Sequence, residues 1–381
     1  MNNELVIINE RNLERIVKNM KALVLNKNDL SVKEMQLYTC DEKYKGFFVS
    51  VIASGICGTD LHIIEKDDNR HKVLGHEFYG IITKVSDGIC IKSLNGEVGV
   101  GDLVTIIPGT VCGECEYCKL LPLNRNYCLH RKVYGMNLQI GTNNLILGGN
   151  MQEVFVPIEY TVYKINSSWK TGLGTLLEPV SVSVKAVKKA LKYAMHIKNR
   201  NLWAMVVGVG TIGFFVCMAL KKRGINVIAV DTNEERRKRA LRNGIRYVFS
   251  GEEIEGSNYI KLINKEMMNI EPDIVFEVAG EPNVLKKCIE WVRKGGVVLE
   301  LGNFINVGTT LISPSVICNK EILLIGSVLA DENSYPEAEI LIDDFNDNCE
   351  EVISNYSIDE YEQAFFDAKN RNNVLKCNLI F

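Results

Sequence analysis

The chain has 381 residues, of which 46% are hydrophobic and 24% charged, a balance typical of a folded globular protein with two domain-sized cores. Its formal net charge of -3 provides no positive field for nucleic acid or for an anionic membrane, which argues against both as partners. The first twenty residues mix charges and lack the apolar stretch of a secretory signal, so a cytoplasmic location is expected.

The first half of the chain has the pattern of a mainly β domain. From Ala22 to about Ile165, short runs with strand composition are separated by turns of Gly, Asp and Asn. The clearest of these runs cover residues 46–52, 79–85 and 103–107. We therefore predict several short strands in this half.

From Leu202 onward, strands and helices alternate. Strands are predicted at residues 203–207, 227–231, 246–249, 273–278, 296–301 and 322–326, with helices ending near Arg223, Asn243 and Arg293. This alternation predicts a parallel sheet with helices on both faces. The uncharged run 202–220 is long enough to cross a bilayer, but its glycine cluster favours a buried strand and helix. After Ser334, helical sequence leads to short strands at 352–356 and 374–380 that can complete the first domain.

A glycine-rich motif follows the first strand of the alternating half. Gly208, Gly210 and Gly213 match G-x-G-x-x-G around Thr211 and Ile212. The first glycine permits a tight turn, the second a close approach to a pyrophosphate, and the third close packing of helix on strand. The free amides at the helix N-terminus can then bind the phosphates. This arrangement predicts a dinucleotide site.

Asp231 ends the next strand, eighteen residues after Gly213. Its carboxylate can accept hydrogen bonds from ribose hydroxyls and would repel a 2′-phosphate, so NAD is favoured over NADP. The alternative is that Asp231 only caps a helix. Arg236 and Arg237 follow and leave NADP use open, although we interpret them mainly as a solvated helix face.

Twelve cysteines in a cytosolic chain of this length do not form a disulfide framework, and four of them crowd into seventeen residues: Cys112, Cys115, Cys118 and Cys128. Four thiols in one turn-rich loop can surround a tetrahedral cation. Thiolate ligands alone leave no position for a substrate, so the site is predicted to be structural. A redox cluster or plain packing are the alternatives.

A second, dispersed set of metal-binding residue types consists of Cys57 in GICGTD, the pair His76 and Glu77 in GHE, and Glu178 in LEP. Mixed thiolate, imidazole and carboxylate ligands suit zinc, and three protein ligands leave a position open for an alcohol oxygen. Spacing alone does not join these three segments.

Taken in order, the motifs resemble the medium-chain zinc-dependent dehydrogenase family, which includes alcohol, sorbitol, threonine, butanediol and glucose dehydrogenases. The resemblance covers nearly the whole chain and rests on GICGTDLHI (55–63), VLGHEFYG (73–80), LLEPVSVSVKAV (176–187), VVGVGTIG (206–213) and DIVFEVAG (273–280).

The resemblance implies an α/β protein of two domains. A GroES-like, mainly β catalytic domain with a structural zinc lobe would cover residues 1–187, and a Rossmann NAD-binding domain with a doubly wound parallel sheet residues 188–328. Residues 329–381 would complete the catalytic domain. The active-site cleft would lie between the two domains, and dimers or tetramers of the chain are implied.

The family's site residues carry over to matching positions. Cys57, His76 and Glu178 look like the ligands of a catalytic zinc, with Glu77 as a fourth ligand or a close carboxylate, and the four cysteines of the lobe look like ligands of one structural zinc. Thr59 and His62 look like the start of a proton path. The use of Glu178 followed by proline is similar to the polyol and threonine branch.

The expected activity is hydride transfer between NAD(P) and a small secondary alcohol, polyol or sugar-like substrate. The alternatives are a zinc-free enone or quinone reductase of the same fold and a non-catalytic dinucleotide-binding or metal-sensing protein. Three features depart from the family. Nine residues separate Cys118 from Cys128, residues 1–19 precede the usual start, and Asn150 and Met151 replace a more regular motif in a region expected to touch substrate.

Overall fold

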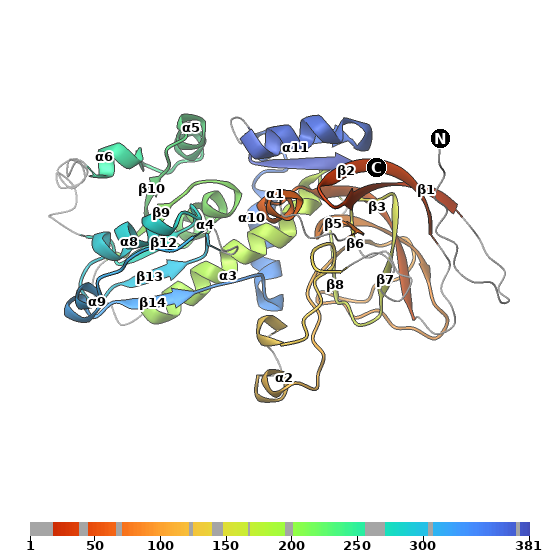
Figure 1. Ribbon diagram of the computed structural model, residues 1–381, viewed down its shortest axis with the longest axis horizontal. Helices are drawn as coiled ribbons and strands as arrows, with labels where there is room; N and C mark the ends of the chain where they lie inside the picture. The colour runs from red at the N-terminus through yellow and green to blue at the C-terminus, as the bar shows by residue number, and fades with distance from the viewer. Residues whose placement is uncertain are drawn as a thin grey trace.

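A computed structural model describes residues 18–37, 45–65, 71–121, 125–138, 148–166, 168–194, 201–255, 271–303, 308–370 and 374–381. Residues 1–17, which belong to the stretch without a family counterpart, lie outside these ranges. Figure 1 shows two bodies side by side, one built on a parallel sheet and the other on antiparallel sheets, with a long helix between them.

The alternating half of the chain forms a six-stranded sheet in the order β11-β10-β9-β12-β13-β14, and every pairing along this path is parallel. The strands are β9 (Trp203–Val207), β10 (Asn226–Val230), β11 (Tyr247–Phe249), β12 (Ile274–Glu277), β13 (Val297–Glu300) and β14 (Leu323–Gly326). The helices are α4 (Thr211–Lys222), α5 (Glu234–Arg242), α6 (Gly251–Glu255), α8 (Pro282–Trp291) and α9 (Pro314–Lys320). The predicted Rossmann-like architecture is confirmed.

Helices cover both faces of this sheet because successive side chains of a strand point to opposite sides. In β9, Ala204 and Val206 pack into the apolar cluster that contains α4, whereas Met205 and Val207 pack into a second cluster with α8. All five residues of β9 are buried, as a continuous apolar strand between two helical layers requires.

The first half of the chain is mainly β, as predicted, and its strands pair antiparallel, while the two strands that the end of the chain adds to the larger sheet pair parallel with each other. The larger sheet has seven strands in the order β15-β16-β3-β5-β6-β8, with β7 paired to β3, and a smaller one has the order β2-β1-β4. The strands are β1 (Lys18–Asn26), β2 (Asp29–Leu37), β3 (Gly46–Gly55), β4 (His71–Val73), β5 (Glu77–Val85), β6 (Leu103–Ile106), β7 (Glu153–Pro157), β8 (Val162–Lys164), β15 (Ile353–Ser357) and β16 (Lys376–Ile380).

The end of the chain returns to the first half. β16 pairs antiparallel with β3, so residues near the C-terminus enter the same sheet as the GICGTD segment. The other helical segments are α1 (Gly58–Glu65), α2 (Glu116–Leu120), η1 (Arg125–Tyr127), η3 (Leu173–Leu176), α3 (Leu177–Ala194), η4 (Glu332–Ser334), α10 (Tyr335–Asp343), η5 (Cys349–Glu351), η6 (Ile358–Glu360) and α11 (Tyr361–Asn370).

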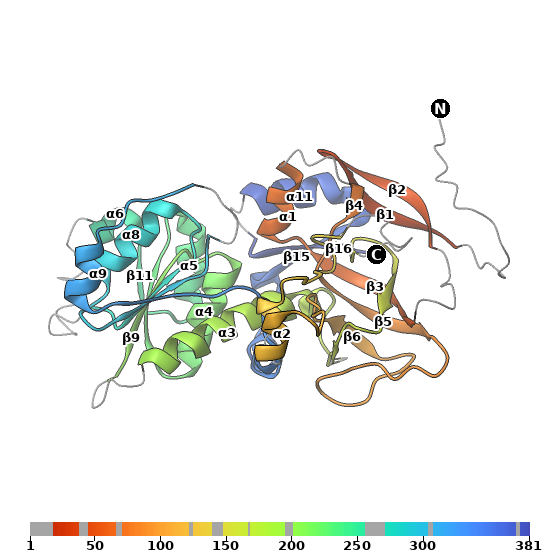
Figure 2. The ribbon, with the colours of Figure 1, turned by 60° about the horizontal axis from the view of Figure 1, so that its bottom comes forward.

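Helix α3 joins the two bodies. It starts beside β5 and η3 of the antiparallel body and continues along α4 and β13 of the parallel one (Figure 2). The boundary expected between residues 187 and 188 therefore falls inside a single helix. The uncharged run 202–220 divides into β9 and α4, and no helix among the described residues is long and apolar enough to span a membrane.

Candidate active site

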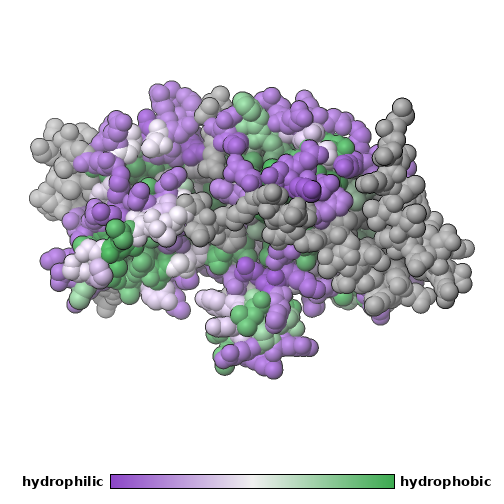
Figure 3. All heavy atoms as spheres, in the orientation of Figure 1, coloured by the Kyte–Doolittle hydropathy of each residue, from purple (hydrophilic) through white to green (hydrophobic). Residues whose placement is uncertain are grey.

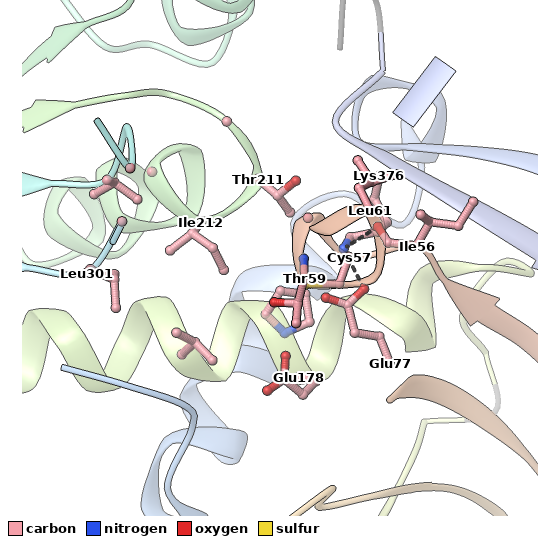
Figure 4. Close-up of a pocket in the computed structure, with 18 of the residues that line it drawn as sticks. Ile56, Cys57, Thr59, Leu61, Glu77, Glu178, Thr211, Ile212, Leu301 and Lys376 are labelled. Carbon is pink, nitrogen blue, oxygen red and sulfur yellow. Dashed lines mark hydrogen bonds and ion pairs between the residues drawn. The ribbon is translucent and has the colours of Figure 1, made fainter. Parts of the chain in front are cut away.

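A pocket of about 400 Å³ opens between the two bodies. Its walls come from the start of α1, the start of β5 and the start of α3 on one side, and from the glycine-rich loop and the ends of β12 and β13 on the other. Figure 4 shows side chains from both bodies converging on this space. The predicted metal-binding residues and most of the predicted cofactor loop therefore face one cavity.

The structure brings Cys57, His76 and Glu77 together, and their ligand atoms all lie within 4.8 Å of one another. The sheet explains this proximity, because Gly55 at the end of β3 is the register partner of Glu77 at the start of β5. The turn before His76 uses Gly75 with φ of 98°, a conformation that favours glycine.

The chemistry and spacing of these three groups fit zinc. Ligands in a tetrahedral zinc site stand about 3.3 to 3.8 Å apart, given bond lengths of about 2.0 to 2.3 Å. The ligand atoms of Cys57, His76 and Glu77 are close enough to coordinate one ion after small side-chain adjustments. Thiolate, imidazole and carboxylate are also the donor types that zinc accepts.

Asp60 is a buried partner of this cluster that sequence reasoning missed. Its Oδ2 accepts a hydrogen bond of 2.9 Å from the backbone N–H of Cys57, and its Oδ1 lies 3.6 Å from Nδ1 of His76. Burial lowers the pKa of His76, but the charges of Asp60 and Cys57 outweigh it and raise that pKa well above its usual value. A carboxylate behind a metal-binding histidine fixes the orientation of the ring. The only signal in the sequence was an acidic residue three positions after Cys57.

Glu178 stands in the first turn of α3, lines the pocket and is 5% exposed. It is not a member of the compact group that contains Glu77. Burial raises the pKa of Glu178 to about 7, with His76 opposing the shift and Glu77 adding to it. Figure 4 shows its carboxylate below the Cys57 side chain, on the opposite side of the pocket from Lys376.

Lys376 of β16 forms a buried ion pair with Glu77. Its ammonium also donates a hydrogen bond of 3.2 Å to the carbonyl of Ile56. Burial lowers the pKa of Lys376, but the charge of Glu77 outweighs it and the pKa rises. The two partners are 299 positions apart in the sequence, so no local pattern could reveal this contact.

The two residues of the predicted proton path, Thr59 and His62, both lie on α1 and line the pocket. The His62 side chain is 41% exposed, and its Nδ1 lies 4.0 Å from a carboxylate oxygen of Glu65. Within the described ranges, no hydrogen bond joins Thr59 to His62. The path between them stays a prediction, with its outer end open to solvent.

The four cysteines of the predicted structural site also come together, with all their sulfur atoms within 4.8 Å of one another. The Sγ atoms of Cys112 and Cys118 are 3.9 Å apart and those of Cys115 and Cys118 are 3.4 Å apart. Four thiolates around one zinc stand about 3.8 Å apart, so the cluster matches the size of the ion. The nine-residue gap before Cys128 does not prevent this arrangement.

The cysteine lobe (residues 111–121 and 125–131) projects from the rest of the molecule, with hydrophobic side chains on its surface (Figure 3). No residue of α2 is buried, so the lobe has little apolar core to hold it. Hydrogen bonds from the backbone N–H groups of Leu129 and Cys118 lower the pKa of Cys115 to about 6. These amides favour the thiolate form that a metal ligand needs.

The glycine-rich loop has the geometry expected of a dinucleotide site. Gly208 adopts φ of 93°, and Gly210 is the N-cap of α4 with an extended backbone. A Cβ on Gly213 would stand 1.8 Å from the carbonyl oxygen of Gly208, whereas the nearest atom to a Cβ on Gly210 is 3.8 Å away. Gly210, Thr211, Ile212 and Gly213 line the pocket.

Asp231 lies beneath this loop and does not line the pocket as Gly210 does. It is 6% exposed, and its Oδ2 accepts a hydrogen bond of 2.7 Å from the N–H of Val209. Its Oδ1 accepts one of 2.8 Å from the N–H of Asn233. The helix N-cap is Asn233, so the alternative role of Asp231 as the cap is wrong. A contact of Asp231 with the ribose stays a prediction.

The two arginines after Asp231 do not form a solvated helix face, so that interpretation is wrong. Arg236 lines the pocket, its side chain is 16% exposed, and its Nη1 lies 3.3 Å from Oδ2 of Asp231. Arg237 donates hydrogen bonds of 2.8 Å to the backbone carbonyls of Asp231 and Thr232. Arg236 is held by the carboxylate at the strand end, and Arg237 by backbone carbonyl groups that follow the strand.

The wall of the pocket opposite α1 is held by a lysine that sequence reasoning also missed. Lys185 of α3 donates hydrogen bonds of 2.7 Å to the carbonyl of Val328 and 3.0 Å to that of Leu329, and both of these residues line the pocket. Leu329 has a φ of 54°, in the left-handed region that side chains disfavour. The two hydrogen bonds from the Lys185 ammonium stabilise the backbone of this segment in its left-handed conformation.

The expected substrate contact near Asn150 and Met151 is not found. Both residues are buried, and neither lines the pocket. The carboxamide oxygen of Asn150 is 2.6 Å from the hydroxyl of Ser54, which donates to it, and Met151 packs in the core of the antiparallel body. These residues fill space behind the pocket instead of facing it.

Residues 45–167 match the alcohol dehydrogenase GroES-like domain, and residues 211–344 match the zinc-binding dehydrogenase domain. The chain is 27% identical over 342 residues to the D-arabitol-phosphate dehydrogenase of Enterococcus avium, which covers 88% of each chain. It is 27% identical over 361 residues to the sorbitol dehydrogenase of Bacillus subtilis, covering 92% of this chain and 93% of that one.

Among solved structures, an alcohol dehydrogenase from Thermotoga maritima has the same fold, with a TM-score of 0.80, 21% identity, and coverage of 95% of this chain and 99% of that one. The chain therefore belongs to the medium-chain family of zinc-dependent, NAD(P)-dependent alcohol and polyol dehydrogenases.

Proposed function

We propose that this protein oxidises a secondary hydroxyl of a polyol or related sugar alcohol, and reduces the corresponding ketone, with NAD as the hydride acceptor. One observation carries the proposal: the cluster of Cys57, His76 and Glu77 faces the same pocket as the loop from Gly210 to Gly213. A metal site and a dinucleotide site that share one cavity provide the two groups that hydride transfer between alcohol and nicotinamide requires. The sorbitol dehydrogenase relative supports a polyol substrate.

The proposed metal ligands are Cys57, His76 and Glu178. Zinc bound there supplies a Lewis acid that lowers the pKa of the substrate hydroxyl. Asp60 holds the His76 ring in place, and Lys376 holds Glu77 beside the site as a fourth ligand or a nearby carboxylate.

Two side chains of the protein transfer the proton of the substrate hydroxyl to solvent. The Thr59 hydroxyl accepts it from the substrate and passes it toward His62, whose imidazole can accept and release a proton. Because the His62 side chain is 41% exposed, the proton can leave to solvent from there. A nicotinamide held in the pocket would supply the hydride acceptor, and the apolar side chains of the pocket would exclude water from the reacting carbon.

The choice of NAD over NADP rests on the pairing of Arg236 with Asp231. Arg236 lies beside the glycine-rich loop, 3.8 Å from the position of a Cβ on Gly210, and Asp231 compensates its charge at 3.3 Å. A 2′-phosphate entering here would meet a guanidinium that is already paired with a buried carboxylate, so its attraction to the site would be reduced. The proposal therefore keeps NAD as the preferred cofactor.

We also propose a homodimer or homotetramer in the cytoplasm. The outer strand of the parallel sheet, β14, carries Leu323 and Leu324, which are 42% and 41% exposed. An apolar strand with free backbone groups at a sheet edge is favourable for pairing with a second copy. Size-exclusion chromatography with light scattering would measure the oligomeric state directly.

The function is tested with a panel of polyols, polyol phosphates, simple secondary alcohols and amino alcohols, each with NAD and with NADP, by following the absorbance of the reduced cofactor. A polyol with NAD is expected to give the highest kcat/KM. Zinc analysis of the same sample should find two ions per chain, one in each cluster. Less than one zinc per chain, together with enone reduction, would instead identify a zinc-free reductase.

The matched variants are Cys57→Ser and Cys318→Ser, the second being an exposed thiol outside both clusters. Cys57→Ser should abolish turnover and lose one zinc while NADH binding is nearly unchanged. Cys318→Ser should behave as the unmodified protein. Full turnover by Cys57→Ser would refute the proposed metal site.

A further inference from the structure

Two buried glutamates meet at the ends of neighbouring strands in the parallel sheet. Glu277 ends β12 and Glu300 ends β13, and the two are register partners in that pair of strands. As register partners in adjacent parallel strands their side chains point to the same side of the sheet, where the carboxamide of Asn303 bridges the two carboxyl groups. Glu277 is completely buried.

The donors around this pair are neutral. Oε1 of Glu277 accepts 3.0 Å hydrogen bonds from the N–H groups of Ala279 and Gly280. The carboxamide of Asn303 donates to Oε2 of Glu277 at 3.3 Å and to Oε1 of Glu300 at 3.1 Å. Among the described residues, neither carboxylate forms an ion pair with a lysine, arginine or histidine.

One carboxyl oxygen has no protein donor. Oε2 of Glu300 is buried and finds no hydrogen-bond partner among the described residues. Two carboxylates this close, without a cation, cannot both ionise at low cost. A proton on one of the two groups would remove this repulsion.

The pair is connected to the pocket through the chain segments that it binds. Ala279 and Gly280, whose amides hold Glu277, line the pocket, as do Leu301 and Gly302 after Glu300. Gly302 packs so closely that a Cβ there would stand 2.4 Å from Oε2 of Glu277. Any separation of the two carboxyl groups would therefore move the wall of the pocket.

We propose that Glu277 and Glu300 are positioning residues that share one proton, and that this proton fixes the wall formed by residues 279–280 and 301–303 against the bound dinucleotide. This inference rests on the proposal that the pocket holds NAD. It adds a control of cofactor affinity that lies outside the metal site and the glycine-rich loop.

The direction of the pH effect follows from the shift of Glu277. Burial, together with the charge and hydrogen bond of Glu300, raises the pKa of Glu277 from 4.5 to about 8, against the backbone hydrogen bonds from Gly280 and Ala279. A carboxyl group with a raised pKa stabilises the folded arrangement most at low pH, where it is protonated. This contribution to the folding free energy is lost as the pH rises through about 8. The titratable group that faces the pair from α8 is Cys288, and burial and the two carboxylates raise its pKa, which keeps it neutral.

The test is a fluorescence titration of the zinc-loaded full chain with NADH between about pH 7 and about pH 9.5, on the unmodified protein and Glu300→Gln. The Kd of the unmodified protein should rise by up to about tenfold per pH unit above the pKa of the pair. The glutamine carboxamide donates to Glu277 at every pH, so the Kd of Glu300→Gln should be nearly constant. Glu290→Gln, an exposed carboxylate on α8, should follow the unmodified protein.

Thermal melting of the same samples gives a second readout that needs no cofactor. At about pH 9, Glu300→Gln should melt higher than the unmodified protein, because it removes the repulsion between two ionised groups. A flat Kd in the unmodified protein, or a lower melting temperature for Glu300→Gln at that pH, would overturn the inference. Absence of NADH binding at every pH would overturn the proposed function and the role of the wall, whereas the melting difference would still report the shared proton.

Discussion

Gly210 and Gly213 of the cofactor loop should respond differently to substitution by alanine. In Gly213→Ala, the new Cβ would lie 1.8 Å from the carbonyl oxygen of Gly208, where ordinary contact needs more than 3 Å, so α4 or the loop must move by more than 1 Å. Overpacking of this kind lowers the free energy of unfolding by about 1–3 kcal/mol. Because the new Cβ meets backbone atoms, which cannot rotate away as a side chain can, we expect a value at the upper end of that range. In Gly210→Ala, the nearest atom is 3.8 Å away and no shift is required.

Converted to a melting temperature, about 3 kcal/mol corresponds to a loss of about 4 °C for a chain of 381 residues, at about 2.1 cal/mol/K of unfolding entropy per residue. Gly210→Ala should melt like the unmodified protein, but its methyl group stands where the pyrophosphate approaches, so NADH binding should weaken by about tenfold or more. Thermal melting and fluorescence titration measure the two effects. Equal melting temperatures for both variants would refute the reasoning from close packing.

The remaining predictions concern the metal sites and the pocket wall. Glu178→Gln should lose most of the catalytic zinc, while Glu77→Gln should retain more of it; equal zinc contents would remove the distinction between the two carboxylates. Cys115→Ala should lose the structural zinc and expose the cysteine lobe to limited proteolysis, because α2 has no buried residue to hold it. Lys185→Met should raise the KM for NAD more than it changes kcat, since hydrogen bonds from a charged donor contribute about 1.5–3 kcal/mol each. The exposed Lys192→Met on the same helix is its control, and an equal effect in both variants would contradict the assignment.

Local pattern predicted the parallel body well, because alternation of apolar strands and helices is a property of short stretches of sequence. The strand at 203–207 was predicted with its observed bounds, and the glycine motif follows it directly. The family resemblance supplied the pairing of Cys57 with His76, which spacing alone did not give. The four cysteines of the lobe are compact in the structure, and so are Cys57, His76 and Glu77, whereas Glu178 lies outside that compact group.

What the sequence could not reveal depends on contacts between distant segments. The partner of Glu77 comes from β16, at the far end of the chain. Arg236 was interpreted as a solvated residue because its pairing with the buried Asp231 cannot be read from helical periodicity. Glu277 and Glu300 each look like an ordinary strand end, and only the strand order places them side by side. Local sequence pattern therefore does not identify polar residues that are buried and paired through tertiary contacts.

The helix that joins the two bodies has a consequence for how the pocket can open. One continuous apolar cluster runs from Ala53 and Tyr79 in the antiparallel body, through α3, to Val206 and Phe276 in the parallel sheet. Pulling the bodies apart would expose that cluster to water at a cost that scales with the area uncovered. We therefore expect the two bodies to stay in contact through this cluster when the cofactor enters, with any opening taking the form of a rotation about it.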